Sequence, residues 1–141
     1  MDDGDDTLQV IIRDIETRSA LLKQKKFAEA RAFLDGRYGA YSNMRHAYEC
    51  EILWEEGKHD EALDQAHNRL MSGDYNVMHI IHCAVYAWRL RRKDVADYLG
   101  SFKSKERETS SVVLAQFVYR DLNGLEVSDE MRHTAWMMGA D

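Results

Sequence analysis

The stretch WEEGKHDEA at residues 54–62 and the stretch WRLRRKDVA at residues 88–96 share one nine-residue frame. Each stretch begins with Trp, ends with Ala, and places a basic residue two positions before an Asp. The second copy starts 88 − 54 = 34 residues after the first. A fainter copy, LKQKKFAEA, occupies residues 22–30. A frame that returns at this period predicts a chain built from repeated helical units.

The last position of the frame is Ala in all three copies, namely Ala30, Ala62 and Ala96. Two helices can cross closely only where the side chains between them are small. We therefore expect the two helices of each unit to cross at this Ala.

The composition and the hydrophobic spacing predict an all-helical protein. The 141 residues fit one domain, and 31% of them are charged while none is Pro. Apolar residues recur at steps of three and four, with capping residues such as Ser42 and Ser128 before two of the runs. This pattern predicts no strand and eight helices, at about residues 8–23, 27–34, 43–56, 60–71, 77–90, 94–102, 109–122 and 129–138. Gly36 and Gly39 are expected to end the second one.

Charge and targeting signals exclude several classes of protein. The net charge of −6 opposes binding to a phosphate backbone, so we expect no nucleic acid partner. The start MDDGDD is acidic, unlike a secretory signal, and no run approaches the ~20 apolar residues of a membrane span. We therefore expect a cytoplasmic protein in which Cys50 and Cys83 stay reduced.

A helix-turn-helix unit of about 34 residues, with a bulky residue late in its first helix and Ala early in its second, resembles the tetratricopeptide repeat. The resemblance implies an all-α, right-handed superhelix of three units, followed by a C-terminal helix pair that caps the stack. The domain organisation that we predict is a disordered acidic lead at 1–7, units at about 8–41, 42–75 and 76–104, and the cap at 105–141.

The resemblance also implies a concave groove, lined by the first helix of each unit, that binds a segment of another protein. Its positions in this chain would be Ile12, Ile15, Ser19 and Leu22, then Met44, Ala47, Glu51, Trp54 and Glu55, then Met78, Ile81, Val85, Trp88 and Arg89. Most of these residues are apolar, which favours a client segment that forms an amphipathic helix. The alternative is that the stripe packs inside the protein, against a C-terminal helix with Met131, Trp136 and Met138.

Small proteins with three such units and an apolar groove resemble the chaperones of bacterial type III secretion, and the stretch SGDYNVMHIIHCAVYAWRLRRKDVADYLGSF at residues 72–102 is similar in layout to the central part of the needle-subunit chaperones. Some members of that group hold translocator proteins, and others hold the needle subunit. The resemblance implies a non-enzymatic chaperone or adaptor without a cofactor. A co-chaperone or a homo-oligomer stays open as a further partner.

His79, His82 and Cys83 form the one cluster that suggests chemistry, either a metal site or a hydrolytic site. A zinc site needs three or four ligands, and no CxxC or HExxH spacing accompanies this cluster. We therefore expect His79 and His82 to be partly exposed helix residues and Cys83 to be a small core residue. Self-association through an exposed apolar stripe, giving a structural scaffold, is a further alternative.

Overall fold

A computed structural model describes residues 3–39, 42–102 and 110–140 of the chain and confirms the all-α prediction. No strand occurs in those three ranges. The helices are α1 (Asp3–Lys23), α2 (Phe27–Tyr38), α3 (Asn43–Glu55), α4 (His59–Met71), α5 (Val77–Leu90), α6 (Lys93–Leu99), α7 (Ser110–Leu122) and α8 (Asp129–Met137).

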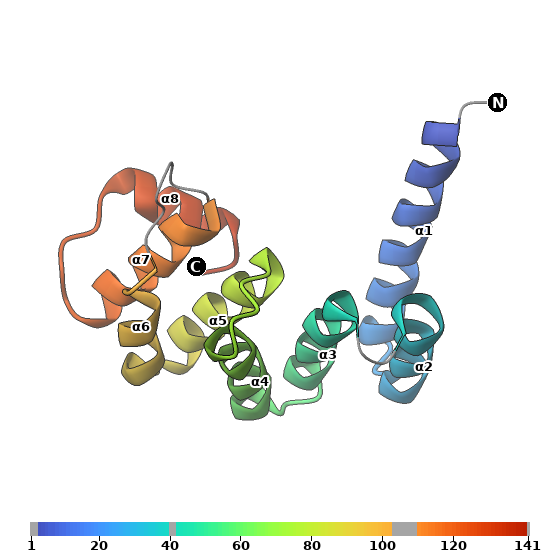
Figure 1. Cartoon of the computed structure of the whole chain (residues 1–141), viewed down its shortest axis with the longest axis horizontal. Coiled ribbons are helices and arrows are strands. Elements are labelled where there is room, and N and C mark those ends of the chain that lie inside the picture. Colours follow the sequence, from blue (N-terminus) through green and yellow to red (C-terminus); the bar gives the residue numbers. More distant parts are fainter. Residues whose placement is uncertain (1–2, 40–41, 103–109, 141) are drawn as a thin grey trace.

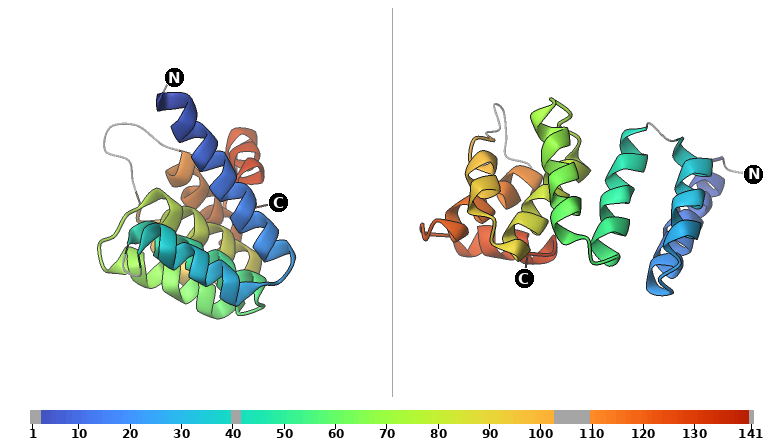
Figure 2. Two further views of the ribbon diagram at one scale, coloured as in Figure 1. Left: turned by 90° about the vertical axis from the view of Figure 1, so that its right-hand side faces the viewer. Right: turned by 90° about the horizontal axis from the view of Figure 1, so that it is seen from below.

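Neighbouring helices in the sequence are also neighbours in space. α2 packs between α1 and α3, α4 packs between α3 and α5, and α7 packs against α5, α6 and α8. The molecule is consequently an elongated row of helices, with α1 and α2 at one end and α6, α7 and α8 at the other (Figure 1). The two further views show α1 running across the end of this row, away from α7 and α8 (Figure 2).

Three turns that join paired helices share one backbone conformation, and they lie within the three copies of the repeated frame. Lys25, Gly57 and Arg91 all have positive φ, at 58°, 86° and 56°. After each of them, the next amide donates a 2.9 Å hydrogen bond to a carbonyl five residues back, as from Lys58 N to the Leu53 carbonyl. This bond closes the helix end in the Schellman manner. The same closure also occurs after Gly73, Gly124 and Gly139, outside the repeated frame, so it is a common way for the helices of this chain to end.

The small residues of the repeated frame are buried, as expected. Ala30, Ala62 and Ala96 each lie in the first turns of the second helix of a pair, and each has an exposed fraction of 0%. Because no part of these three Ala side chains is accessible to solvent, the neighbouring helices pack closely around them.

The buried apolar residues form two clusters of different size. The large cluster draws on helices α3 to α8 and contains fully buried residues such as Leu63, Leu99 and Leu114. The small cluster consists of Ala30, Leu34 and Ile52, with half-buried residues of α1, α2 and α3 packed around it. α1 and α2 are thus attached to the body through much less apolar packing.

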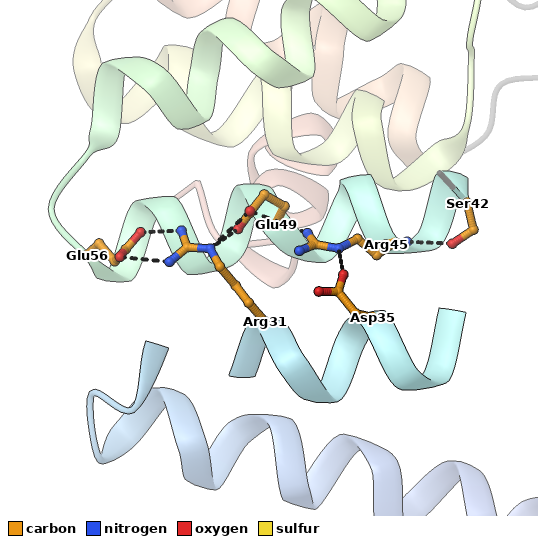
Figure 3. Close-up of polar contacts among 6 residues, drawn as sticks. All are labelled: Arg31, Asp35, Ser42, Arg45, Glu49 and Glu56. Carbon is orange, nitrogen blue, oxygen red and sulfur yellow. Dashed lines mark hydrogen bonds and ion pairs between the residues drawn. The ribbon is translucent and has the colours of Figure 1, made fainter. Parts of the chain in front are cut away.

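Ion pairs reinforce the contact between α2 and α3. Arg31 on α2 donates to both carboxylate oxygens of Glu49 at 3.0 Å, and it forms two further hydrogen bonds with Glu56. Arg45 on α3 donates to Asp35 on α2 at 2.8 Å. Figure 3 shows these pairs along the contact between the two helices, where the Glu49 carboxylate and the Glu56 carboxylate both point toward Arg31. Paired, partly buried guanidinium groups of this kind fix the register of two helices.

Several helix bounds differ from the prediction. α1 begins at Asp3, before the predicted start at residue 8, while residues 1 and 2 of the predicted disordered lead lie outside the described residues. α2 continues through Gly36 and ends at Gly39, which has φ 74°, so the prediction that Gly36 stops this helix was wrong. A Gly inside a helix costs only about 1 kcal/mol, which neighbouring contacts can offset.

The third pair is shorter than expected. α6 ends at Leu99 and not at residue 102, and Gly100 follows it. A Cβ atom at Gly100 would lie 2.5 Å from the Tyr119 ring, so only Gly allows α7 to approach this closely. The predicted start of the next helix at residue 109 and the loop before it lie outside the described residues.

The predicted caps are confirmed. The Ser42 hydroxyl accepts from the Arg45 amide at 3.1 Å, and the Ser128 hydroxyl accepts from the Met131 amide at 3.2 Å. Asn76 caps α5 in the same way, accepting from the Met78 amide at 2.8 Å, although the sequence analysis did not single it out.

Candidate interaction surface

α1 carries a row of exposed apolar side chains, which we call the α1 stripe: Leu8, Ile11, Ile12 and Ile15. Their exposed fractions lie between 41% and 54%. They recur at steps of three and four, so they share one side of the helix. Single exposed apolar residues are common, whereas a contiguous row of four large ones indicates a surface that another molecule covers.

Most of the stripe lies in the part of α1 that extends beyond the helix beside it. Arg37, near the end of α2, donates to both carboxylate oxygens of Asp14 on α1, at 2.7 and 3.0 Å. The residues of α1 before Asp14 therefore extend past the end of α2. The view in Figure 1 shows this free N-terminal part of α1 rising above α2 and α3.

The stripe continues the side of α1 that faces α3. Arg18 lies 3.7 Å from the ring centroid of Tyr48 and 3.5 Å from a carboxylate oxygen of Glu51, and both of these residues belong to α3. Leu22 packs against the small apolar cluster. Ile15 precedes Arg18 by one helical turn on the same side. A segment lying on the stripe would thus run beside the start of α3.

Polar and aromatic contacts occupy the middle of the predicted groove. Glu51 on α3 bridges Arg18 on α1 and His82 on α5, with His82 Nε2 3.3 Å from its carboxylate oxygen. Trp54 stacks between Tyr86, at 4.4 Å between ring centroids, and His59, at 4.0 Å. These side chains are engaged within the chain, so they bind the helices to one another.

The C-terminal end of the predicted groove is covered. Trp88 donates from Nε1 to Asp121 on α7 at 2.9 Å, and Arg89 donates to the carbonyl of Gly139 at 3.2 Å. Val85 is only 5% exposed, and a Cβ atom at Gly139 would lie 3.7 Å from it. The C-terminal part of the chain therefore covers this end of the stripe, but the predicted packing of Trp136 there was wrong, since Trp136 is 60% exposed while Met131 and Met138 are half-buried.

The remaining predicted groove residues differ in exposure. Ala47 is fully buried, whereas Leu22, Met44, Met78 and Ile81 are half-buried. Among the predicted groove positions, the most accessible apolar side chains are therefore those of α1, although Val77 at the start of α5, outside the predicted groove, is 55% exposed. Leu8 and Ile11 are the most exposed residues of the α1 stripe. They fall within the first predicted helix, but they were not among the predicted groove positions.

The histidine cluster on α5 is buried, so the prediction of partly exposed histidines was wrong. His79 is 0% exposed and His82 is 6% exposed. Burial lowers the pKa of His79, although Asp74 lies 3.2 Å from its Nε2 atom. Asp74 lies in the turn just before α5, whereas Glu51, which meets His82, comes from α3, a contact that the local spacing could not reveal.

The two thiols do not have the properties of reactive groups. Cys50 and Cys83 are buried, as expected for core residues, and burial raises the pKa of Cys50 to about 12 and that of Cys83 further. A protonated thiol is a poor nucleophile and a poor metal ligand. In the described ranges, no group of three or more His, Cys, Asp or Glu residues could hold a metal ion. None of the described helices is long and apolar enough to cross a membrane.

Searches of protein-family models, curated proteins and solved structures find no match to this chain.

Proposed function

We propose that this protein is a non-enzymatic interaction module, a chaperone or adaptor of the tetratricopeptide-like kind, that buries an apolar or amphipathic segment of a client protein. The observation that carries the proposal is the α1 stripe, because four exposed apolar side chains in a row are costly to leave in water. An amphipathic helix in the client could cover them with its own apolar side.

The tetratricopeptide-like superhelix is part of this proposal. Its support is the recurrence of one turn conformation at Lys25, Gly57 and Arg91, together with the buried Ala that follows each turn. Successive units that repeat one turn geometry stack into a curved row, and the first helices then line the inner side. Leu22, Met44 and Ile81 would extend the client site from the α1 stripe along that side.

Type III secretion is the cellular setting that we propose for this module, on the basis of the resemblance at residues 72–102. In that setting the client segment would be a helix that must not assemble before secretion. The metal or hydrolytic alternative has less support, because His79, His82 and Cys83 are all buried and diverge from any common surface site.

Two matched variants test the client site. Ile15 belongs to the α1 stripe, and Val10, 41% exposed, lies away from it on the same helix. We expect wild type and Val10→Asp to capture one partner from lysate of the native host, and Ile15→Asp to lose it. A synthetic peptide spanning the helix of that partner should then bind with the same ranking in fluorescence anisotropy. Equal capture by all three forms, or no capture by wild type, would reject the proposal.

A further inference from the structure

A polar pocket, which we call the α4 pocket, lies where α2, α3 and α4 meet. Asp35 lines it from α2, His46 and Glu49 from α3, and Asn68 and Arg69 from α4. Its volume is about 750 Å³, within the range of sites that hold small molecules. The described residues that line it are all polar or charged, and none of them belongs to the α1 stripe or to the predicted groove. The α4 pocket therefore suits a polar ligand and is separate from the proposed client site.

The acids of the α4 pocket are already paired with arginines. Glu49 accepts a hydrogen bond from Arg31 at 3.0 Å and lies 3.4 Å from Arg45. Asp35 accepts from Arg45 at 2.8 Å. Figure 3 shows both carboxylates beside these guanidinium groups. The negative charges of the pocket are thus largely balanced by cations of the chain itself.

The side of the pocket formed by α4 has donors without partners. Gln65, Asn68, Arg69 and Ser72 follow one another at steps of three, one and three residues, so they share one side of the helix. Within the ranges that the structure describes, no ion pair or side-chain hydrogen bond joins Gln65, Asn68 or Arg69 to another residue. Each of these three side chains donates hydrogen bonds, and Arg69 adds a positive charge. This side of the pocket therefore favours a ligand that accepts hydrogen bonds and is negatively charged.

The electrostatic environment of His46 also favours an anion. Burial lowers the pKa of His46, and the positive charges of Arg69 and Arg45 lower it further. The negative charges of Asp74 and Glu49 raise this pKa, with smaller effects. The positive charges therefore dominate at the ring, although the pocket contains charges of both signs. The ring is neutral at neutral pH and donates one hydrogen bond.

We propose that the α4 pocket binds a small polar ligand that carries one carboxylate group. Arg69 pairs with the carboxylate through two parallel hydrogen bonds, the geometry that a guanidinium group favours. The amides of Gln65 and Asn68 and the ring of His46 bind the remaining acceptors of the ligand.

A phosphate group fits the α4 pocket less well than a carboxylate. Arg69 is the one cation in the described lining that has no ion pair. The carboxylates of Asp35 and Glu49 repel a second negative charge on the ligand. The site is therefore matched to a single negative charge.

NMR titration of the isotope-labelled full chain tests this site. The probe is N-acetylglutamic acid amide, which has one carboxylate and two amide groups, and N-acetylglutamine amide is its neutral match. We expect the acidic probe to shift the side-chain N–H signals of Gln65, Asn68 and Arg69, and the neutral probe and inorganic phosphate to shift them much less. No shift at these residues even at high millimolar concentration, or equal shifts with the neutral probe, would overturn the inference.

Two substitutions separate a built site from general attraction to arginines. Arg69→Gln should raise the dissociation constant of the acidic probe by about 10-fold or more, because it removes the unpaired charge. Arg132→Gln removes an exposed charge on α8 and should leave the dissociation constant unchanged. Equal weakening by both variants would contradict the assignment. Circular dichroism verifies that both variants keep their helices.

A gain of affinity gives a test that does not depend on removing a contact. Asn68 is exposed, so Asn68→Lys adds a second cation to the pocket without disturbing the core. This variant should bind the acidic probe more tightly and should also bind phosphate. Unchanged binding of both anions would contradict the inference.

The source of the carboxylate can be determined with a third probe, a blocked pentapeptide with one central Glu between Gly residues. Tighter binding of the pentapeptide than of the single amino acid would identify an acidic peptide segment as the ligand, and weaker binding would identify a free small molecule. Because the α4 pocket and the α1 stripe share no residue, loss of probe binding in Arg69→Gln should leave client capture intact. The two proposals can therefore fail separately.

Discussion

The two ends of the molecule are held together in different ways. At the C-terminal end, helices α4 to α7 share one large apolar cluster that includes Leu63, Leu99 and Leu114. At the N-terminal end, α1 and α2 depend on the small cluster around Leu34 and on ion pairs such as Arg31 with Glu49. The end with the smaller core carries the α1 stripe, although exposed apolar side chains also occur at the other end, such as Trp136 and Met137 on α8. The apolar residues of the α1 stripe therefore contribute little to the chain's own core.

This contrast implies that the two ends differ in local stability. Segments with few buried apolar contacts open at lower free energy than the core. α1 and α2 should therefore unfold before α5 and α7, and a bound partner should protect them.

The largest expected effect comes from deleting a core side chain at each end. Leu63 and Leu34 are both 0% exposed. Leu63→Ala should lower the free energy of global unfolding by about 2–5 kcal/mol, because it leaves a cavity in the large cluster. Leu34→Ala should mainly increase hydrogen exchange in α1 and α2, while α5 and α7 keep their protection. Equal loss of protection at both ends in Leu34→Ala would contradict the contrast.

Overpacking at the helix crossings should have an intermediate effect. Ala62→Leu places a larger side chain at a fully buried crossing in the large cluster, which should cost about 1–3 kcal/mol. Ala28→Leu, at an exposed position of α2, is the control and should change stability little. Urea denaturation followed by circular dichroism measures both. An unchanged free energy of unfolding in Ala62→Leu would show that this crossing is looser than the structure indicates.

The smallest expected effect concerns the ion pairs of α2 and α3. The hydrogen bonds from Arg31 lower the pKa of Glu56 below its ordinary value of 4.5, so the carboxylate stabilises the fold when it is ionised. This contribution is complete above the unfolded pKa and is lost as the pH falls through the lower pKa of the folded state. Glu56→Gln should cost about 1 kcal/mol at neutral pH. The gap between wild type and variant should close in acid; a gap independent of pH would contradict this assignment.

Much of the fold could be predicted because its causes are local. The repeated frame, the caps at Ser42 and Ser128 and the hydrophobic spacing identified the helices and their order. The prediction that Gly36 ends its helix was wrong, because the preference of a single Gly for a turn is smaller in free energy than the packing that holds α2 together. The left-handed turns at Lys25 and Arg91 could have been found from their alignment with Gly57.

The surface was harder to predict because periodicity does not distinguish a core-facing stripe from a partner-facing one. Leu8 and Ile11 follow the same spacing as core residues, and only the short length of α2 leaves them exposed. Val85 and Trp88 also follow the groove register, yet α7 and the residues around Gly139 cover them. The C-terminal part fits no copy of the repeat, so its position over α5 could not be derived from the 34-residue period.

The most direct test of the α1 stripe is site-specific photo-crosslinking in the native host. A benzophenone amino acid would replace Ile15 in one form of the protein and Val10 in the other. We predict that position 15 forms covalent adducts with a client and that position 10 forms few. Mass spectrometry of the adducts identifies the partner. Equal adducts from both positions, or none from position 15, would contradict the claim that this side of α1 is a binding surface.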